Sequence, residues 1–382
     1  MQEVVIVDGL RTPIGAFLGG LANFSAPDLA SFVIEALVKK NDIDPESIDE
    51  LILGQVLQAG VGQAPARQAL LKAGLSVSSA CVTVNKVCGS GLKAVMMAHD
   101  AIALNHSKIV IAGGMESMSN APHALLQSRI GLRMGDKTLT DLITNDGLLD
   151  PASKAHMGQF SEACAQIYNF SRQAQDEYAA LSYEKAIFAQ KQGFFNNELV
   201  SINTVEQDEE PLRYRPEKMP TLKPAFFPTG SITAANASKI NDGAAALLLM
   251  SKASAQDHGM AHMASIVSMA NFAHEPALFS TAPAFAIKQA LQKANLSLSD
   301  IDCFEINEAF SVVSMACIKD LNLDPKKVNM FGGAVALGHP IGASGARILV
   351  TLLNVMQVNN FKYGVAAICL GGGEALAMVV KM

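Results

Sequence analysis

Two cysteines and one histidine lie among glycines at three widely separated places in this chain. Cys88 belongs to the segment VCGSGL, Cys369 to ICLGGG, and His339 to GHPIG between them. A thiol near a helix N-terminus can act as a nucleophile, because the helix end stabilises its thiolate. A second thiol and an imidazole can then move protons. This combination indicates acyl transfer through a cysteine thioester.

The residues around Cys88 predict a tight turn between a strand and a helix. Residues 82–86 are typical of a strand or turn, and Gly89 and Gly91 allow close approach of a ligand before an apolar helix begins. In such a turn the Cys88 backbone N–H can point at a thioester oxygen. A small buried residue at a helix start would give the same pattern, so the spacing alone leaves both interpretations open.

The other two segments offer a base and hydrogen-bond donors. His339 precedes Pro340, which predicts an extended turn just before a helix. An imidazole is well suited to accept a thiol proton near neutral pH and to return it. Cys369 ends an apolar strand, and the glycines after it free backbone N–H groups for an oxyanion hole, with Gly371 as the expected donor. Taken singly, a surface histidine and a buried structural cysteine are the ordinary interpretations.

A fourth segment, NEAF at residues 307–310, follows an acidic strand at 302–306. We expect it to start a helix that continues through residue 318. Asn307 would be an ordinary N-cap there. Its amide could equally hold a water or a substrate carbonyl.

An internal repeat underlies these segments. SGLKAVMM at 90–97 is followed by IVIAGGMESM at 109–118, and SGARILV at 344–350 is followed by AAICLGGGEAL at 366–376. Each pair predicts a helix start and then a buried strand that ends in glycines. The repeat therefore indicates a duplicated α/β unit, with two similar halves packed face to face and a site between them.

Apolar runs without alternation predict strands that helices cover on both faces. Such runs occur at 4–7, 51–54 and 109–112. Helices are expected at 27–39, 65–73, 91–104, 171–192 and 284–294.

The stretch from about residue 120 to 239 has a different character. It holds long polar helices and proline-rich loops, which indicate an insertion lying over the core. We therefore expect an N-terminal half at 1–119, an inserted loop domain at 120–248 and a C-terminal half at 249–382.

Composition narrows the class of protein. The chain has 382 residues, 50% of them hydrophobic and 17% charged, which suffices for a large core in a globular protein. The net charge of −6 offers nothing that would recruit nucleic acid or an anionic membrane. The six cysteines lack metal-ligand spacing, so we expect no metal and reduced thiols. No export signal or membrane-length apolar run is visible, which favours a cytoplasmic protein.

With these four motifs in order, the chain resembles the thiolase family along its whole length. The resemblance rests on NKVCGSG at 85–91, NEAF at 307–310, GHPIGASG at 338–345 and CLGGG at 369–373. It implies an α/β thiolase fold with two similar halves in five α-β-α-β-α layers, and an inserted loop domain that holds coenzyme A. It also implies a dimer or, as we expect here, a homotetramer built as a dimer of dimers.

Within the family, His156-Met157-Gly158 and the upstream Asp146-Gly147-Leu148 are similar to the acetyl-CoA acetyltransferase branch. The resemblance makes Ser238, in the segment that begins at Ala234, a contact to pantetheine. Arg213 becomes a candidate for the adenine and phosphate end, where Arg215, Lys218 and Lys223 add positive charge or simply form a solvated loop. The pantetheine and acyl pocket would be lined by Leu148, His156, Met157, Phe226 and Phe310.

The chain departs from the family pattern at two positions. Ala235 stands where a glycine is frequent, and Glu374 follows the triple glycine at a position where the family varies. Neither residue belongs to the expected catalytic atoms.

The resemblance implies a reaction in which Cys88 takes an acetyl group from acetyl-CoA while His339 relays its proton. Cys369 then deprotonates a second acetyl-CoA, and acetoacetyl-CoA and CoA leave. A water held by Asn307 together with His339 would stabilise the enolate, and the N–H groups of Cys88 and Gly371 would hold the second oxyanion. CoA thioesters are the substrates, and no cofactor is expected.

Four alternatives stay open at this stage. A long-chain 3-ketoacyl-CoA thiolase keeps all four motifs, although His156 and Met157 argue against it. A condensing enzyme acting on carrier-protein substrates would normally place a histidine at position 369. The others are a silent, lipid-binding thiolase-like subunit and a Cys88-dependent hydrolase.

Overall fold

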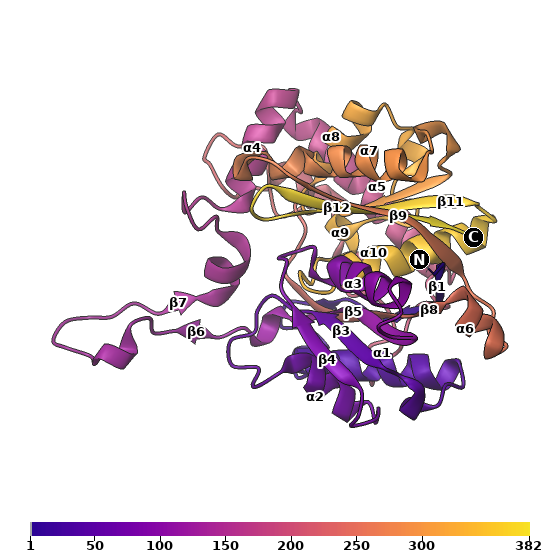
Figure 1. The fold of residues 1–382 in the computed structure, drawn as a ribbon. Coiled ribbons are helices and arrows are strands. Elements are labelled where there is room, and N and C mark those ends of the chain that lie inside the picture. The colour runs from indigo at the N-terminus through magenta and orange to yellow at the C-terminus, as the bar shows by residue number, and fades with distance from the viewer. Residues whose placement is uncertain (1) are drawn as a thin grey trace.

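The computed structural model describes residues 2–382, in which strands and helices alternate along most of the chain (Figure 1). The strands of the large sheet are β1 (Val4–Arg11), β2 (Gly15–Ala16), β3 (Glu50–Gly54), β4 (Ala80–Val84), β5 (Ile109–Ser117), β8 (Asn241–Ser251), β9 (Ala264–Ala273), β10 (Cys303–Ile306), β11 (Tyr363–Leu370) and β12 (Glu374–Lys381). The helices are α1 (Ala26–Lys40), α2 (Pro65–Lys72), α3 (Ser90–Ala103), α4 (Met157–Tyr168), α5 (Arg172–Lys191), α6 (Lys252–Asp257), α7 (Ala282–Ala294), α8 (Ser311–Leu321), α9 (Ala334–Leu337) and α10 (Ser344–Asn359).

The sheet consists of two groups of strands with the same internal order. The first group runs β1-β8-β5-β3-β4 and the second runs β9-β12-β11-β10. The β3–β5 and β10–β11 pairs are parallel, whereas β5–β8 and β11–β12 are antiparallel. Strands β1 and β9 pair only through Val5↔Ser265 and Ile6↔Ala264 in the described chain, so a narrow seam joins the groups. The two halves thus share one topology, as the internal repeat predicts.

Five layers follow from how the helices cover these strands (Figure 1). Helices α3 and α10 lie between the two groups and share one apolar core with the inner faces of both. Helix α1 packs on the outer face of the first group, with α2 beside it, and α7 packs on the outer face of the second. The α/β thiolase-type layering expected from the sequence is confirmed.

Local sequence explains why these helices begin where they do. At α1, the Ser25 side chain accepts a hydrogen bond from the Asp28 N–H, and the Asp28 carboxylate accepts one from the Ser25 N–H. This capping box satisfies free backbone donors at the helix start, while Lys39 and Lys40 suit the negative end of the helix dipole. The five expected helices appear as α1, α2, α3, α5 and α7, each within two residues of its predicted limits.

The two halves differ in how their equivalent strands are connected. Between β11 and β12 there are only three glycines, 371–373, whereas residues 118–240 lie between β5 and β8. This insertion contains α4, α5 and a long arm with the two-stranded sheet β6 (His123–Ala124) and β7 (Thr140–Asp141), which projects from the body (Figure 1). Strand β8 is a core strand of the first group, so the boundary expected at residue 248 falls inside β8 rather than at the edge of a domain.

The described residues contain no helix that is both long and apolar enough to cross a membrane. Within residues 2–382, no three His, Cys, Asp or Glu side chains are arranged to hold a metal ion.

Candidate active site

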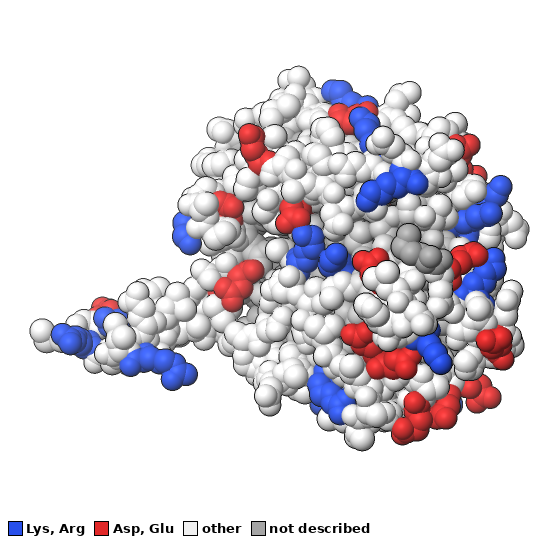
Figure 2. Space-filling view, in the orientation of Figure 1, with Lys and Arg blue, Asp and Glu red and all other residues white. Residues whose placement is uncertain are grey.

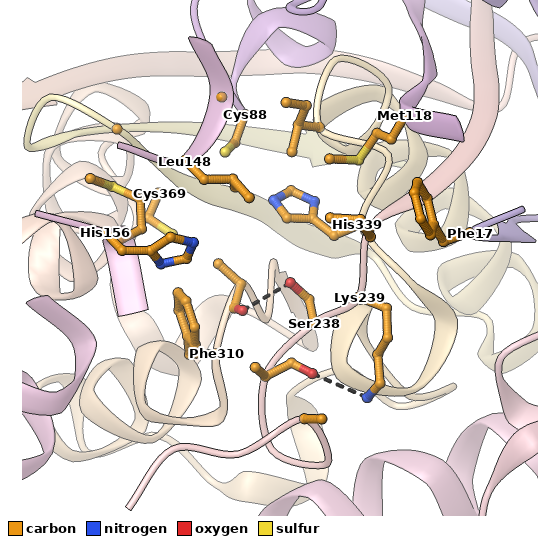
Figure 3. A pocket seen from close by; sticks show the side chains of 18 of the residues that line it. Phe17, Cys88, Met118, Leu148, His156, Ser238, Lys239, Phe310, His339 and Cys369 are labelled. Carbon is orange, nitrogen blue, oxygen red and sulfur yellow. Dashed lines mark hydrogen bonds between the residues drawn. The ribbon is translucent and has the colours of Figure 1, made fainter. Parts of the chain in front are cut away.

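A cavity of about 560 Å³ lies where the two halves and the insertion meet (Figure 3). The structure brings all but one of the sequence-predicted site residues to its wall. They are Cys88, Leu148, His156, Met157, Arg213, Phe226, Ala234, Ser238, Phe310, His339, Cys369 and Gly371. The exception, Asn307, is fully buried and contacts the ring of His339.

Cys88 is held in a strained turn between β4 and α3. Val87 adopts φ +47°, a left-handed conformation that is rare for a β-branched residue. The turn is stabilised by the Asn85 carboxamide oxygen, which accepts from the Val87 N–H, and by the Ser90 hydroxyl, which donates to the Val87 carbonyl. Helix α3 begins at Ser90, so Cys88 precedes the helix by two residues. The strain is consistent with a turn whose purpose is to present one side chain.

The surroundings of the Cys88 thiol combine burial with two backbone donors. Burial raises the pKa of Cys88 to about 12, and the backbone N–H groups of Gly371 and of Cys88 itself oppose this by hydrogen bonding to the sulfur. Cys88 is therefore a neutral thiol at rest, rather than the helix-stabilised thiolate that the sequence suggested. These are the two N–H groups that the sequence predicted as donors of an oxyanion hole.

His339 is a neutral base with a defined tautomer. Its Nδ1 atom lies 2.5 Å from Ser344 Oγ, and that hydroxyl donates its own proton to the Pro340 carbonyl at 2.9 Å. Ser344 must therefore accept from Nδ1–H, which leaves the lone pair on Nε2. Burial, with a smaller effect of the Arg347 charge, lowers the pKa of His339 to about 3. The imidazole is therefore neutral at rest, with the lone pair of Nε2 available, and burial makes it a weaker base than a free histidine.

Asn307 lies behind the histidine rather than on the cavity wall. Its Nδ2 atom is 3.5 Å from His339 Nε2, longer than an ordinary hydrogen bond, and its buried Oδ1 atom has no hydrogen-bond partner among residues 2–382. An unpartnered buried amide oxygen suits a bound water. The helix expected from residue 307 begins instead at Ser311, so Asn307 is not an N-cap.

The turn that bears His339 is fixed to the first half of the chain. Asn241 Oδ1 accepts from the His339 N–H at 2.9 Å, and Glu116 Oε2 accepts from the Gly342 N–H at 2.9 Å. Gly338 has φ +109°, and a Cβ there would lie 2.5 Å from the Asn241 side chain, so the turn needs glycine at this position. Burial raises the pKa of Glu116 to about 7, against three backbone donors that favour the carboxylate.

Cys369 lies near the end of β11, deeper than Cys88. It is 1% exposed, and burial together with the nearby Cys88 raises its pKa well above the ordinary value. A thiol of this kind is a poor acid, and its conjugate thiolate is a correspondingly strong base. Figure 3 shows Cys369, Cys88 and His339 around the same cavity.

Aromatic and polar side chains narrow the cavity on the side of the insertion. His156 caps α4 through Nδ1, which accepts from the Gly158 N–H, and its ring stacks on Phe226 at 4.7 Å. Burial lowers the pKa of His156. Phe226 in turn meets Phe310 edge-on at 6.0 Å. Leu148, at the end of a helical turn (Ile143–Leu148), completes this apolar wall.

A further loop of the insertion, which starts at Ala234, forms another part of the cavity wall. Ser238 Oγ donates to the Ala309 carbonyl at 2.9 Å, which ties the loop to the segment before α8. Arg213, in a short helical turn (Pro211–Arg213), and exposed Ala234 lie at the outer end of the cavity and also border a second hollow of about 230 Å³. Arg215 and Lys218 line that hollow as well.

Several residues that shape the site were missed by sequence reasoning. Ser344, Asn241 and Glu116 hold the histidine turn, and Lys239 lines the cavity next to Ser238. Ser344 had a signal, because it lies five residues after His339 at a predicted helix start. Asn241 and Glu116 reach the site only through tertiary contacts, whereas Lys239 directly follows the predicted Ser238 in the sequence.

Comparison with known proteins agrees with this architecture. The family model for the thiolase N-terminal domain matches residues 4–253, and that for the thiolase C-terminal domain matches residues 260–382. The chain belongs to the thiolase family.

Its relatives within the family are similar over their full length. The chain is 48% identical to "Acetyl-CoA acetyltransferase" of Escherichia coli, covering 100% of this chain and 99% of that relative. It is 46% identical to "Acetyl-CoA acetyltransferase" of Cupriavidus necator, covering 100% of both chains. The crystal structure of Acat5 thiolase from Ascaris suum in complex with coenzyme A superposes with a TM-score of 0.96 at 45% identity, covering 100% of both chains.

Proposed function

We propose that this protein is an acetyl-CoA C-acetyltransferase, which condenses two molecules of acetyl-CoA to acetoacetyl-CoA and CoA and also catalyses the reverse thiolysis. The observation that carries the proposal is the joint placement of Cys88, His339 and Cys369 on one cavity. Full-length similarity to acetyl-CoA acetyltransferases supports the choice of substrate.

In the first half-reaction Cys88 Sγ attacks the carbonyl carbon of acetyl-CoA. Its proton passes to Nε2 of His339 and then to the departing CoA sulfur, so that acetyl-Cys88 and CoA result and the imidazole is neutral again. The N–H groups of Cys88 and Gly371 bind the oxyanion of the tetrahedral adduct. One such donor typically contributes roughly 3 to 4 kcal/mol to the transition state.

In the second half-reaction His339 takes the proton of Cys369, and the thiolate formed removes a proton from the methyl carbon of a second acetyl-CoA. The resulting enolate attacks the acetyl carbon, and the Cys88 sulfur leaves with the electron pair of its C–S bond. The imidazolium returns its proton to Cys88, so both thiols and the imidazole end as they began. A water on Asn307 Oδ1, together with His339, would stabilise the enolate oxygen.

This sequence of steps accounts for every proton and electron pair without a cofactor, so none is proposed. The six cysteines are all unpaired, which agrees with a reducing compartment and supports a cytoplasmic location as part of the proposal.

We further propose a homotetramer built as a dimer of dimers. Strand β4 lies at the free edge of the first group, where an open strand can pair with a second copy. The projecting arm carries apolar side chains exposed to solvent, with Lys and Arg near its tip (Figure 2). These exposed side chains, which suit contact between dimers, are Leu126, Ile130, Leu132, Met134 and Leu139.

The test is CoA-dependent cleavage of acetoacetyl-CoA compared with 3-ketooctanoyl-CoA. Strong cleavage of the short substrate alone supports the proposal, because His156, Phe226 and Phe310 narrow the acyl side of the cavity. Preference for the longer substrate would instead indicate a degradative 3-ketoacyl-CoA thiolase. Absence of both activities would leave a silent thiolase-like subunit, and hydrolysis without CoA would indicate a hydrolase.

A further inference from the structure

Lys239 is an unusual residue in the wall of the cavity. It directly follows Ser238, yet its ammonium group turns away from the catalytic residues and donates to two backbone carbonyls (Figure 3). These are Ala237 O at 3.1 Å and Val335 O at 2.9 Å. Within residues 2–382 no carboxylate lies close enough to form a salt bridge with it.

An aromatic ring completes the surroundings of this ammonium. Lys239 Nζ lies 5.0 Å from the centroid of the Tyr183 ring, within the range of a cation–π interaction. Burial lowers the pKa of Lys239 to about 8, while Glu210 and Glu308 act in the opposite direction from further away. Two carbonyls and a ring face form a site for a monovalent cation, which this chain fills with its own side chain.

The two carbonyls belong to segments that act on different parts of the substrate. Ala237 precedes Ser238 in the loop expected to contact pantetheine, and the same loop pairs with Phe310 through Ala237. Val335 lies in α9, four residues before His339. The Val335 N–H donates to the Glu308 carboxylate, and the Val335 carbonyl accepts from Lys239, so two side chains hold α9 in place. Lys239 therefore joins the CoA-binding loop to the element that leads into the catalytic histidine.

A third connection runs from Lys239 to the basic end of the cavity. The Tyr183 ring stacks on the Tyr214 ring at 4.4 Å with an interplanar angle of 8°. Tyr214 follows Arg213, the expected contact for the CoA phosphates. The ammonium thus lies at the point where the pantetheine loop, the histidine element and the phosphate loop come together.

We propose that Lys239 is a positioning residue whose ammonium acts as an internal monovalent cation, aligning the CoA-binding loop with the His339 element. The proposal rests on the proposed function for the identity of the ligand, CoA. It requires a donor at this place, because an apolar side chain would leave two buried carbonyls unsatisfied, and the Tyr183 ring face favours a donor that carries positive charge.

The experiment replaces Lys239 by alanine and supplies the missing cation from solution. Lys239→Ala should raise both the Kd for CoA, measured by calorimetry, and the KM for acetoacetyl-CoA by about tenfold, the loss expected for one unsatisfied buried polar group. Ethylammonium or propylammonium chloride should recover most of that loss. Ethanol, propanol and sodium chloride should not. Lys239→Met, which keeps most of the length of the side chain but neither its charge nor its donors, should behave like the alanine variant.

Lys185 provides the matched control. It is also partly buried and donates to one backbone carbonyl, that of Val328, but it does not line the cavity. Lys185→Ala should leave CoA affinity unchanged and show no response to amines. A purely structural role of Lys239 would appear as a lower melting temperature without amine recovery, and this result would overturn the proposal.

The remaining outcomes separate this proposal from the proposed function. If the native chain binds CoA and cleaves acetoacetyl-CoA while both Lys239 variants match it, only the role of Lys239 is wrong. If the native chain neither binds CoA nor cleaves acetoacetyl-CoA, the proposed function fails and the alignment role fails with it.

Discussion

The Nδ1 atom of His339 lies 2.5 Å from the Oγ atom of Ser344, which is five residues further along the chain. Because the Ser344 hydroxyl donates to the Pro340 carbonyl, it can only accept from the imidazole, and this fixes the tautomer with a free lone pair on Nε2. The basic atom of the site is therefore set by a residue that does not line the cavity.

Replacing Ser344 by alanine should lower kcat for thiolysis by about 10- to 100-fold, the usual cost of losing the partner that orients a functional histidine. KM should change little, because Ser344 does not contact the proposed CoA path. Steady-state kinetics with acetoacetyl-CoA measures both. Thr351→Val is the control, since Thr351 lies on the same helix and bonds to Glu198 away from the site. Equal kinetics for Ser344→Ala and the native chain would contradict the tautomer assignment.

Variants that lack Cys88 or Cys369 should be blocked at different half-reactions. Cys369→Ala keeps Cys88 and His339, so it should still exchange labelled CoA with acetyl-CoA through acetyl-Cys88. Its acetoacetyl-CoA formation should fall by roughly 10²- to 10⁴-fold, as for the loss of a general base. Cys88→Ala should lose both reactions. Isotope exchange followed by chromatography distinguishes the two variants.

The roles would be assigned wrongly if Cys88→Ala kept the exchange or if Cys369→Ala lost it completely. Cys164→Ala is a suitable control, because Cys164 is a buried cysteine of α4 outside the cavity wall. It should retain both reactions.

The pH dependence of Cys88 reactivity follows from its burial. Its folded-state pKa of about 12 lies above the ordinary thiol value, so the thiolate fraction should rise about tenfold per pH unit across pH 6 to 9. His339 stays neutral in this range because its pKa is lowered to about 3. Alkylation of Cys88 by iodoacetamide, followed by mass spectrometry, should therefore show no plateau in rate. A plateau below pH 7 would instead reveal a resting thiolate–imidazolium pair.

The pKa shifts of His339 and Cys88 make the free energy of unfolding depend on pH in opposite ways. A histidine whose pKa is lowered on folding contributes stability that is complete above its unfolded value of 6.5 and is lost as the pH falls toward 3. A raised cysteine pKa contributes stability that is complete below its unfolded value of 9.0 and is lost as the pH rises toward 12. Thermal melts should therefore show a broad maximum between these two values, and a shift of the acid limb in His339→Asn would identify its share.

The sequence predicted the parts of the site that lie in local motifs. Cys88, His339 and Cys369 each follow or precede glycines in a recognisable turn, and the structure brings all three to one cavity. The repeat that starts at Ser90 and Ser344 likewise predicted two equivalent halves, since periodicity and glycine positions are local properties.

What the sequence could not predict depends on long-range contacts. Burial raises the pKa of Cys88 and makes it a neutral thiol. The residues next to Cys88 in the sequence do not indicate this burial. Asn307 resembles an N-cap by type, but a tertiary contact with His339 keeps it in an irregular segment before α8. The expected limit of the insertion at residue 248 falls inside β8, because residues 244–250 of this strand are apolar and give no sign of whether the strand belongs to a loop domain or to the core.

The contact between α3 and α10 offers a last prediction, on stability rather than activity. These helices are the equivalent members of the repeat, and each begins with a Ser-Gly pair. A Cβ on Gly91 would lie 2.8 Å from the Ala346 nitrogen, and a Cβ on Gly345 would lie 2.5 Å from the Leu92 nitrogen. Both clashes are with backbone, which cannot move aside as a flexible side chain does.

Gly345→Ala should therefore lower the free energy of unfolding by about 1–3 kcal/mol through overpacking, although alanine favours helix. Urea denaturation followed by circular dichroism measures the change. Gln357→Ala, on an exposed part of α10, should stay within about 0.5 kcal/mol of the native chain. A stabilising effect of Gly345→Ala would show that the two helices can separate at this point, and that glycine there is not required by their close approach.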